Sequence, residues 1–253
     1  LALALRHNPD DQGFYTPPIL GAFGAAATAA KLLALDQEQT VACLGLTLSQ
    51  AMCSSQFKRD PQSSLRAVRD AFAAHAGLMS ASLAARGVRG FEGAFEGEHG
   101  LYALYARGEY DAAALLDGLG TRFLGEQVSF KPWPSCRGTH AFVEAALQLR
   151  AAHALEDVVE LTAHGAELNR MLAEPIAQKQ SPQTPIDAKF SVPFCVATAF
   201  VRGRLGLSDF TPAALQAPEV LELARRVRFV ADPTAGMREA TRGKLRLVTR
   251  SGE

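Results

Sequence analysis

The sequence carries no net charge: 26 lysines and arginines balance 26 aspartates and glutamates over 253 residues. A chain without an overall positive field lacks the long-range attraction by which proteins collect nucleic acids or anionic membrane surfaces. We therefore expect neither nucleic acid nor membrane as a partner, and any charged ligand must be bound by local groups.

Cysteine and long apolar runs are also scarce. The four cysteines are scattered, without the CxxC or other spacing of metal ligands, so the sequence predicts no metal site. The apolar run 19–35 is broken by Gly21, Gly24, Thr28 and Lys31, which argues against a membrane span there. Such scattered thiols are typical of a reducing compartment, and we expect a cytoplasmic protein.

Apolar residues are plentiful, at 48% of the chain, which is enough for one large core or two moderate ones. Helical patterns occupy residues 19–36, 36–54, 65–87 and 109–120. Later runs predict strands at 157–165, 225–232 and 244–252, between helices at 139–155, 190–202 and 211–226. The sequence thus predicts a mainly α protein with an α+β part: an all-helical domain over 1–130, then a smaller α/β domain over 131–253.

The first helical stretch contains small residues at helical spacing. The small residues Gly21, Gly24, Ala25, Thr28 and Ala29 would let a neighbouring helix approach closely, and we expect a helix to lie against this stretch. The flat surfaces of such glycine- and alanine-rich helices also favour a homodimer.

The stretch FKPWPSCRGTH, residues 130–140, combines two prolines with several reactive side chains. Pro132 and Pro134 fix φ and predict a stiff, extended lead into a helix. That helix should begin near Ser135 or Thr139, either of which can cap it. On one interpretation the segment is only the proline-stiffened start of an ordinary helix.

On the other interpretation the segment is functional. Lys131, Cys136, Arg137 and His140 would surround a helix N-terminus, where free N–H groups and the helix dipole attract anions. The positive surroundings should lower the pKa of Cys136 and of His140. A neutral His140 could then act as a general base.

Four stretches, in order, resemble the MmgE/PrpD family of 2-methylcitrate dehydratases. They are residues 13–36, residues 66–100, the segment 130–140 and PIDAKFSVPFCVATAFVRG at 185–203. The resemblance implies a helical domain with a smaller α/β lid, a homodimer, and no metal or other cofactor. Family chains are longer, and this sequence looks like the middle of one.

The resemblance also implies chemistry. Family members dehydrate 2-methylcitrate, decarboxylate cis-aconitate or epimerise related acids, so we expect a hydro-lyase acting on a small di- or tricarboxylate. Two alternatives stay open: a decarboxylase or epimerase of the same family, or a non-catalytic, dimeric carboxylate-binding relative. Substitutions at expected site positions favour the non-catalytic relative. Tyr15 stands where many members have histidine, Arg66 where they have lysine, and Arg69 at a further histidine position.

The candidate site residues follow from the matched stretches. We expect His140 to perform acid/base work and Tyr15 to supply a phenol proton in place of the missing histidine. The expected substrate-binding residues are Arg66, Arg69, Lys131, Ser135, Cys136, Arg137 and Lys189.

Overall fold

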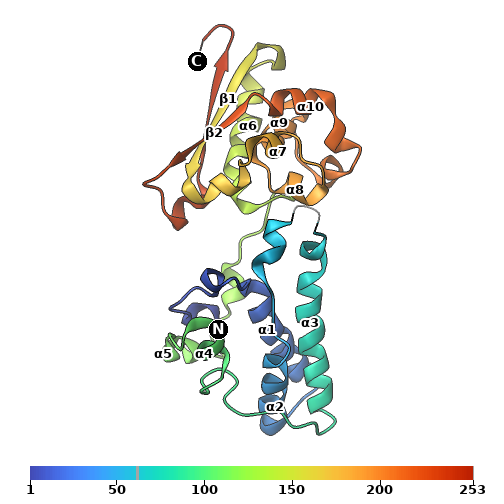
Figure 1. The fold of residues 1–253 in the computed structure, drawn as a ribbon, viewed down its shortest axis with the longest axis vertical. Helices are drawn as coiled ribbons and strands as arrows, with labels where there is room; N and C mark the ends of the chain where they lie inside the picture. Colours follow the sequence, from blue (N-terminus) through green and yellow to red (C-terminus); the bar gives the residue numbers. More distant parts are fainter. Residues whose placement is uncertain (61–62, 253) are drawn as a thin grey trace. The chain divides into compact units, whose positions relative to one another are not determined.

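The computed structural model describes residues 1–60 and 63–252. The chain divides into a helical unit, Leu1–Glu126, and a mixed unit, Gln127–Glu253 (Figure 1). A helical part followed by a part that contains both helices and strands confirms the predicted fold class. In the described residues, the helices lack the combination of length and apolar character that a membrane crossing requires.

The helical unit is built around three longer helices that pack against one another. Its α-helices are α1 (Thr16–Leu32), α2 (Gln37–Leu48), α3 (Leu65–Ala84), α4 (Leu101–Ala106) and α5 (Ala112–Leu116). Asp36 caps the start of α2 with a capping box: its carboxylate accepts from the Gln39 N–H, and the Gln39 side chain accepts from the Asp36 N–H.

Helices α1 and α3 approach each other closely, at only part of the predicted stretch. A Cβ at Gly77 of α3 would lie 2.5 Å from both the Ala22 oxygen and the Ala26 nitrogen of α1, so only glycine fits. At Gly21 and Gly24 a Cβ would meet nothing within 4 Å. The predicted close approach of a helix is therefore confirmed at Ala25, which a Cβ at Gly77 would meet at 2.8 Å, but not at these two glycines, because α1 packs on α3 through its alanine face.

The predicted end of the second helix was wrong, and α4 was missed. The second helix ends at Leu48 rather than near residue 54, because the chain then extends and Ser54 pairs with Phe14. The predicted end of the third stretch at Gly87 is confirmed: regular α3 ends at Ala84, and Gly87 closes it with a left-handed φ of 83° while its N–H donates to the Ala84 oxygen at 3.0 Å.

The mixed unit contains a three-stranded sheet in the order β2-β1-β3. Its strands are β1 (Val158–Ala166), β2 (Val227–Asp232) and β3 (Lys244–Thr249), which confirms the three predicted strands. The central strand β1 pairs parallel with β2 and antiparallel with β3. The helices are α6 (His140–Ala152), α7 (Ile176–Gln180), α8 (Pro185–Lys189), α9 (Val192–Arg202) and α10 (Pro218–Ala224).

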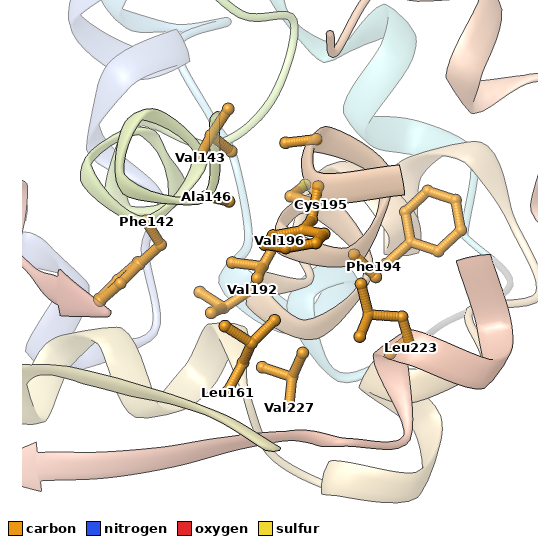
Figure 2. Packing of buried hydrophobic residues seen from close by; sticks show 14 of the residues in the cluster. Phe142, Val143, Ala146, Leu161, Val192, Phe194, Cys195, Val196, Leu223 and Val227 are labelled. Atoms are coloured by element: carbon orange, nitrogen blue, oxygen red, sulfur yellow. The ribbon is translucent and has the colours of Figure 1, made fainter. Parts of the chain in front are cut away.

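Helix α9 forms the centre of the mixed unit's core. Every residue from Val192 to Phe200 is buried, and the helix packs against α6 and α10 (Figure 2). Phe142 of α6 and Leu161 of β1 belong to the same continuous cluster. Each such side chain contributes about 1.5–3 kcal/mol when it leaves water. This core fixes the first turn of α6, where the candidate histidine lies.

The segment before α6 also departs from the prediction. Residues 132–135 form bends instead of an extended lead, because the Ser135 N–H donates to the Trp133 oxygen at 2.9 Å. Thr139 stands at the N-cap of α6 but does not cap it; its hydroxyl donates to the Cys136 oxygen at 2.8 Å. A 3₁₀ turn, Arg137–Thr139, leads directly into the helix instead.

Candidate active site

His140 is the first residue of α6 and is only 5% exposed. Its ring meets the Trp133 ring edge to face, with centroids 5.4 Å apart. Among the described residues, neither imidazole nitrogen finds a hydrogen-bond partner of good geometry. The position of this imidazole therefore comes from packing and from the backbone of its own segment.

The electrostatics of His140 agree with the expectation from the sequence. Burial is the main cause that lowers its pKa below the ordinary 6.5, and the charges of Arg137 and Lys131 add to this effect. The carbonyl groups of Ser135 and Trp133 oppose it. The imidazole is therefore predominantly neutral at pH 7 and able to accept a proton.

The N–H groups around this helix start are less available to an anion than expected. The Cys136 N–H donates to the Lys189 oxygen at 2.8 Å, and the Thr139 N–H donates to the Cys136 oxygen at 2.9 Å. The His140 N–H donates to the Arg137 oxygen. Side-chain cations, more than free backbone donors, give this region its positive character.

Beneath the segment lies a small buried polar cluster. Ser135 Oγ and Thr139 Oγ1 are 2.7 Å apart and share a hydrogen bond. Cys195 Sγ donates to the Ala188 oxygen at 3.4 Å, and burial raises the pKa of this thiol to about 12. Ser135 and Cys195 are thus engaged inside the protein, and Cys195 is a packing residue rather than a nucleophile.

The structure brings the predicted residues of the mixed unit into one neighbourhood. Lys131 Nζ donates to the Ser135 oxygen at 3.4 Å, next to the turn that carries Arg137. Cys136 is half-buried against the core and tied by its backbone to Lys189. The Lys189 ammonium lies 5.5 Å from the centre of the Phe210 ring.

A second group of predicted residues meets in the helical unit. Arg69 of α3 donates from Nη2 to the Tyr15 hydroxyl at 3.2 Å, and its guanidinium carbon lies 4.2 Å from the Tyr15 ring centre and 4.9 Å from that of Phe57. Its side chain is 10% exposed, with Nε 3.6 Å from an Asp70 oxygen. Within residues 1–60 and 63–252, Arg69 Nε and Nη1 have no hydrogen-bond partner. Arg66 lies one helical turn earlier on α3.

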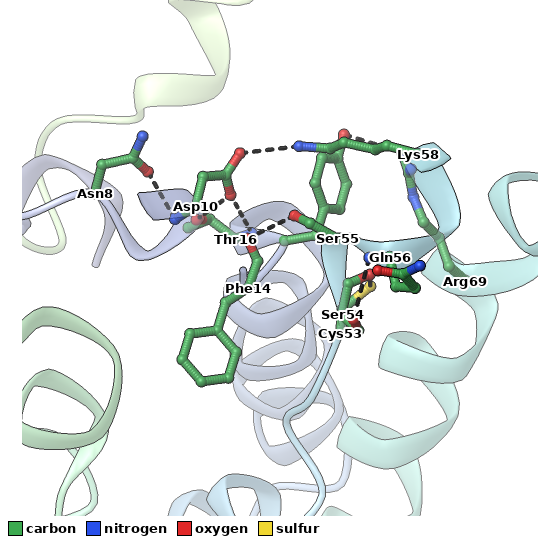
Figure 3. A network of polar contacts seen from close by, with 11 residues as sticks. Asn8, Asp10, Phe14, Thr16, Cys53, Ser54, Ser55, Gln56, Lys58 and Arg69 are labelled. Carbon is green, nitrogen blue, oxygen red and sulfur yellow. Dashed lines mark hydrogen bonds and ion pairs between the residues drawn. The ribbon is translucent and has the colours of Figure 1, made fainter. Parts of the chain in front are cut away.

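Lys58 belongs to this group and was missed by the sequence analysis. Its Nζ lies 4.6 Å from the Tyr15 ring centre and 3.1 Å from Asp10 Oδ2 (Figure 3). Asp10 is held in turn by the N–H and hydroxyl of Thr16, at 3.3 and 3.2 Å. No local pattern signals this arrangement, because Lys58 and Asp10 are 48 positions apart.

Three or more His, Cys, Asp or Glu side chains do not come together as a candidate metal site anywhere in the described part of the chain. The groups on which the two neighbourhoods rest are thus cations, hydroxyls and one imidazole. Cations bind carboxylates, and a neutral imidazole transfers protons.

Comparison with known proteins identifies the class. Residues 1–113 match the MmgE/PrpD N-terminal domain and residues 133–253 match the MmgE/PrpD C-terminal domain, so the chain belongs to the MmgE/PrpD family. This is a family of carboxylate lyases, dehydratases and decarboxylases.

Two curated relatives are more specific. The cis-aconitate decarboxylase-like protein oryM of Aspergillus oryzae is 25% identical over 233 residues, which cover 87% of this chain and 48% of that protein. The cis-aconitate decarboxylase of Homo sapiens is 25% identical over 241 residues, covering 92% of this chain and 48% of that enzyme. The chain therefore spans about half the length of these relatives.

Proposed function

We propose that the complete protein is a lyase that acts on a small di- or tricarboxylate. His140 carries this proposal, because it is a buried imidazole of lowered pKa in a segment that also holds Lys131 and Arg137. A neutral histidine can take up a proton, and the imidazolium formed can return it. The two neighbouring cations disfavour lasting protonation, so the proton is passed on.

Two reactions fit these groups. Loss of carbon dioxide leaves an electron pair on the neighbouring carbon, which must then be protonated. Loss of water requires that a C–H proton be removed and the leaving hydroxide be protonated. In both, negative charge grows beside carboxylates, and cations facing it lower the barrier. The names of the two relatives favour decarboxylation, whereas dehydration of 2-methylcitrate is the reaction expected from the sequence.

Carboxylate binding in the helical unit is assigned to Arg69, with Arg66 and Lys58 as further cations. The buried Nε and Nη1 of Arg69 are donors that a carboxylate can satisfy in a paired geometry. Tyr15 accepts from Arg69, which leaves its own hydroxyl proton free to donate to a ligand oxygen. Tyr15 is therefore the proposed proton donor of this unit.

In the mixed unit, Lys131 and Arg137 are the proposed carboxylate-binding cations. The Ser135 hydroxyl already shares a hydrogen bond with Thr139, and the Cys136 N–H already donates to the Lys189 oxygen. We assign to them, and to Lys189, the support of the segment that carries the cations.

A homodimer is part of the proposal. Helix α3 exposes Val68, Phe72 and Met79 along one stripe, and Phe72 is 62% exposed. A second copy of the same face is a suitable cover for such a stripe, because both surfaces are apolar. Phe72→Glu should then convert the complete protein from dimer to monomer in sedimentation experiments, and a monomeric wild type would contradict the dimer.

The experiment that tests the proposed function is a substrate panel. The complete protein is incubated with cis-aconitate, citrate and 2-methylcitrate, while proton NMR follows the products and a coupled assay follows carbon dioxide. Turnover with release of carbon dioxide identifies a decarboxylase, and turnover without it identifies a hydro-lyase. Binding of these acids without turnover would instead support the non-catalytic relative, and absence of both would overturn the proposal.

A further inference from the structure

Asn169 joins three segments that are far apart in the sequence. It lies in the 3₁₀ turn Glu167–Leu172 that follows β1, and it is 2% exposed. Its Nδ2 donates to the Gly138 oxygen at 3.2 Å and to the Ala240 oxygen at 3.0 Å. One amide thus ties the turn before α6 both to the end of β1 and to the turn before β3.

The packing around this amide is tight on both sides. A Cβ at Gly138 would lie 2.8 Å from Asn169 Nδ2, and a Cβ at Gly165 would lie 3.2 Å from its Oδ1. Among the described residues, this buried Oδ1 has no hydrogen-bond partner. An orphaned buried acceptor costs free energy, so the amide is not optimised for stability alone.

The turn that Asn169 holds is the one that places His140. Gly138 lies two residues before the histidine, and the His140 N–H donates to the Arg137 oxygen of the same turn. The imidazole nitrogens have no side-chain partner among residues 1–60 and 63–252, and the polar groups that act on them are the backbone carbonyls of Ser135 and Trp133. The ring is therefore oriented by the backbone of this segment and by its contact with the Trp133 ring. A shift of the turn would therefore move the ring directly.

We infer that Asn169 is a positioning residue for His140, fixing the turn Arg137–Thr139 so that the imidazole stays buried against Trp133. Its importance for catalysis rests on the proposed function. Its effect on the buried state of the imidazole does not, and can be measured without substrate.

The chain offers a matched control in Gln180. Its Nε2 also donates to two backbone oxygens, those of Arg225 and Val227, both at 3.1 Å. Asn169→Ala and Gln180→Ala each remove one amide that binds two carbonyl groups in the mixed unit. Only the first of these amides contacts the turn that leads to His140.

The test is an NMR titration of the complete protein with labelled histidine, in which the His140 signal is assigned from its loss in His140→Gln. In Asn169→Ala the pKa of His140 should rise toward its ordinary 6.5, because the loosened turn admits water and burial is the main cause of the low pKa. The Lys131 and Arg137 charges remain in both variants. In Gln180→Ala the His140 titration should match the wild type.

A second arm measures kinetics on whichever acid is turned over. We expect kcat to fall about 10-fold or more in Asn169→Ala, with KM nearly unchanged, because proton transfer depends on the position of the base. If Asn169→Ala does not fold, Asn169→Ser keeps a polar side chain at this position, and Gly138→Ala pushes the turn and the amide apart from the other side. An unchanged His140 titration in every folded variant would overturn the inference, and failure of all three to fold while Gln180→Ala folds would show a structural role instead. If the His140 titration shifts in a protein that turns over none of the acids, the inference about Asn169 stands and the proposed function is refuted.

Discussion

The two units hold their candidate groups in opposite ways. In the helical unit the cations are placed by partners: Lys58 pairs with Asp10, and Arg69 contacts the Tyr15 hydroxyl and the Asp70 carboxylate. In the mixed unit His140 is placed by burial, and in the described part of the chain its ring nitrogens have no side-chain partner. A cation keeps its charge in contact with water and partners, whereas a histidine that must stay neutral benefits from desolvation.

The cores of the units match this difference. Among its described residues the helical unit has two separate clusters, a small one of Ala26, Ala29, Cys43, Ala81 and Ala84 and a second one with larger side chains such as Phe23 and Tyr102. The described residues of the mixed unit form one continuous cluster, into which α6 is packed. His140, at the start of α6, is therefore anchored on an undivided core.

The largest effect should come from removing the imidazole. His140→Ala is expected to lower kcat by about 10²- to 10⁴-fold while leaving KM within a few-fold, because carboxylate binding is distributed over the cations. His153→Ala is the matched control: this histidine is exposed at the other end of the same helix and should retain wild-type activity. A His140→Ala enzyme with more than about a tenth of the wild-type rate would contradict the contrast between the units.

The difference in cores predicts the next effect. Phe200→Ala, a fully buried change in α9, should lower the free energy of unfolding by about 3–5 kcal/mol. Leu48→Ala, in a helical-unit cluster, should cost less, toward the lower end of the about 2–5 kcal/mol typical of this change, since the smaller side chain leaves a smaller cavity. Urea unfolding monitored by circular dichroism measures both. Equal losses would show that the two cores are equally consolidated.

A smaller effect is expected from the cations. Arg69→Ala should weaken the binding of a carboxylate such as citrate about 10- to 100-fold, because the carboxylate loses the charged N–H donors of the guanidinium. Lys58→Ala should weaken binding only several-fold, since Asp10 already neutralises part of its charge. Isothermal titration calorimetry of the complete protein checks the order. Arg86→Ala, in which an exposed arginine beyond α3 is removed, is the control and should bind normally.

The sequence predicted the secondary structure of the mixed unit better than that of the helical unit. The three strands were found because β-branched runs between turn residues are a local signal. The end of α2 could not be found, because it depends on the pairing of Ser54 with Phe14, 40 residues earlier by sequence number.

The candidate site shows the same limit. His140 and its positive neighbours lie within one short segment, so their shared chemistry could be inferred from spacing. Lys58 and Asn169 each act on residues about 30 or more positions away, through Asp10 and Gly138. Neither carries a local motif, and only the folded chain brings them to their partners.

The smallest expected effect is a dependence of stability on pH that originates in the mixed unit. The pKa of His140 is lowered in the folded protein, so below about pH 6.5 the unfolded chain binds a proton that the folded chain does not. The stabilisation by the neutral imidazole is therefore complete above pH 6.5 and is lost as the pH falls through the folded-state pKa. For one group the slope is at most about 1.4 kcal/mol per pH unit.

Urea unfolding of the wild type and of His140→Gln, compared between about pH 5 and about pH 8, isolates this contribution because all other groups cancel. The difference between the two proteins should shrink toward low pH; a difference that stays constant would mean that the imidazole is hydrated, and that the mixed unit places its histidine no differently from the way the helical unit places its cations.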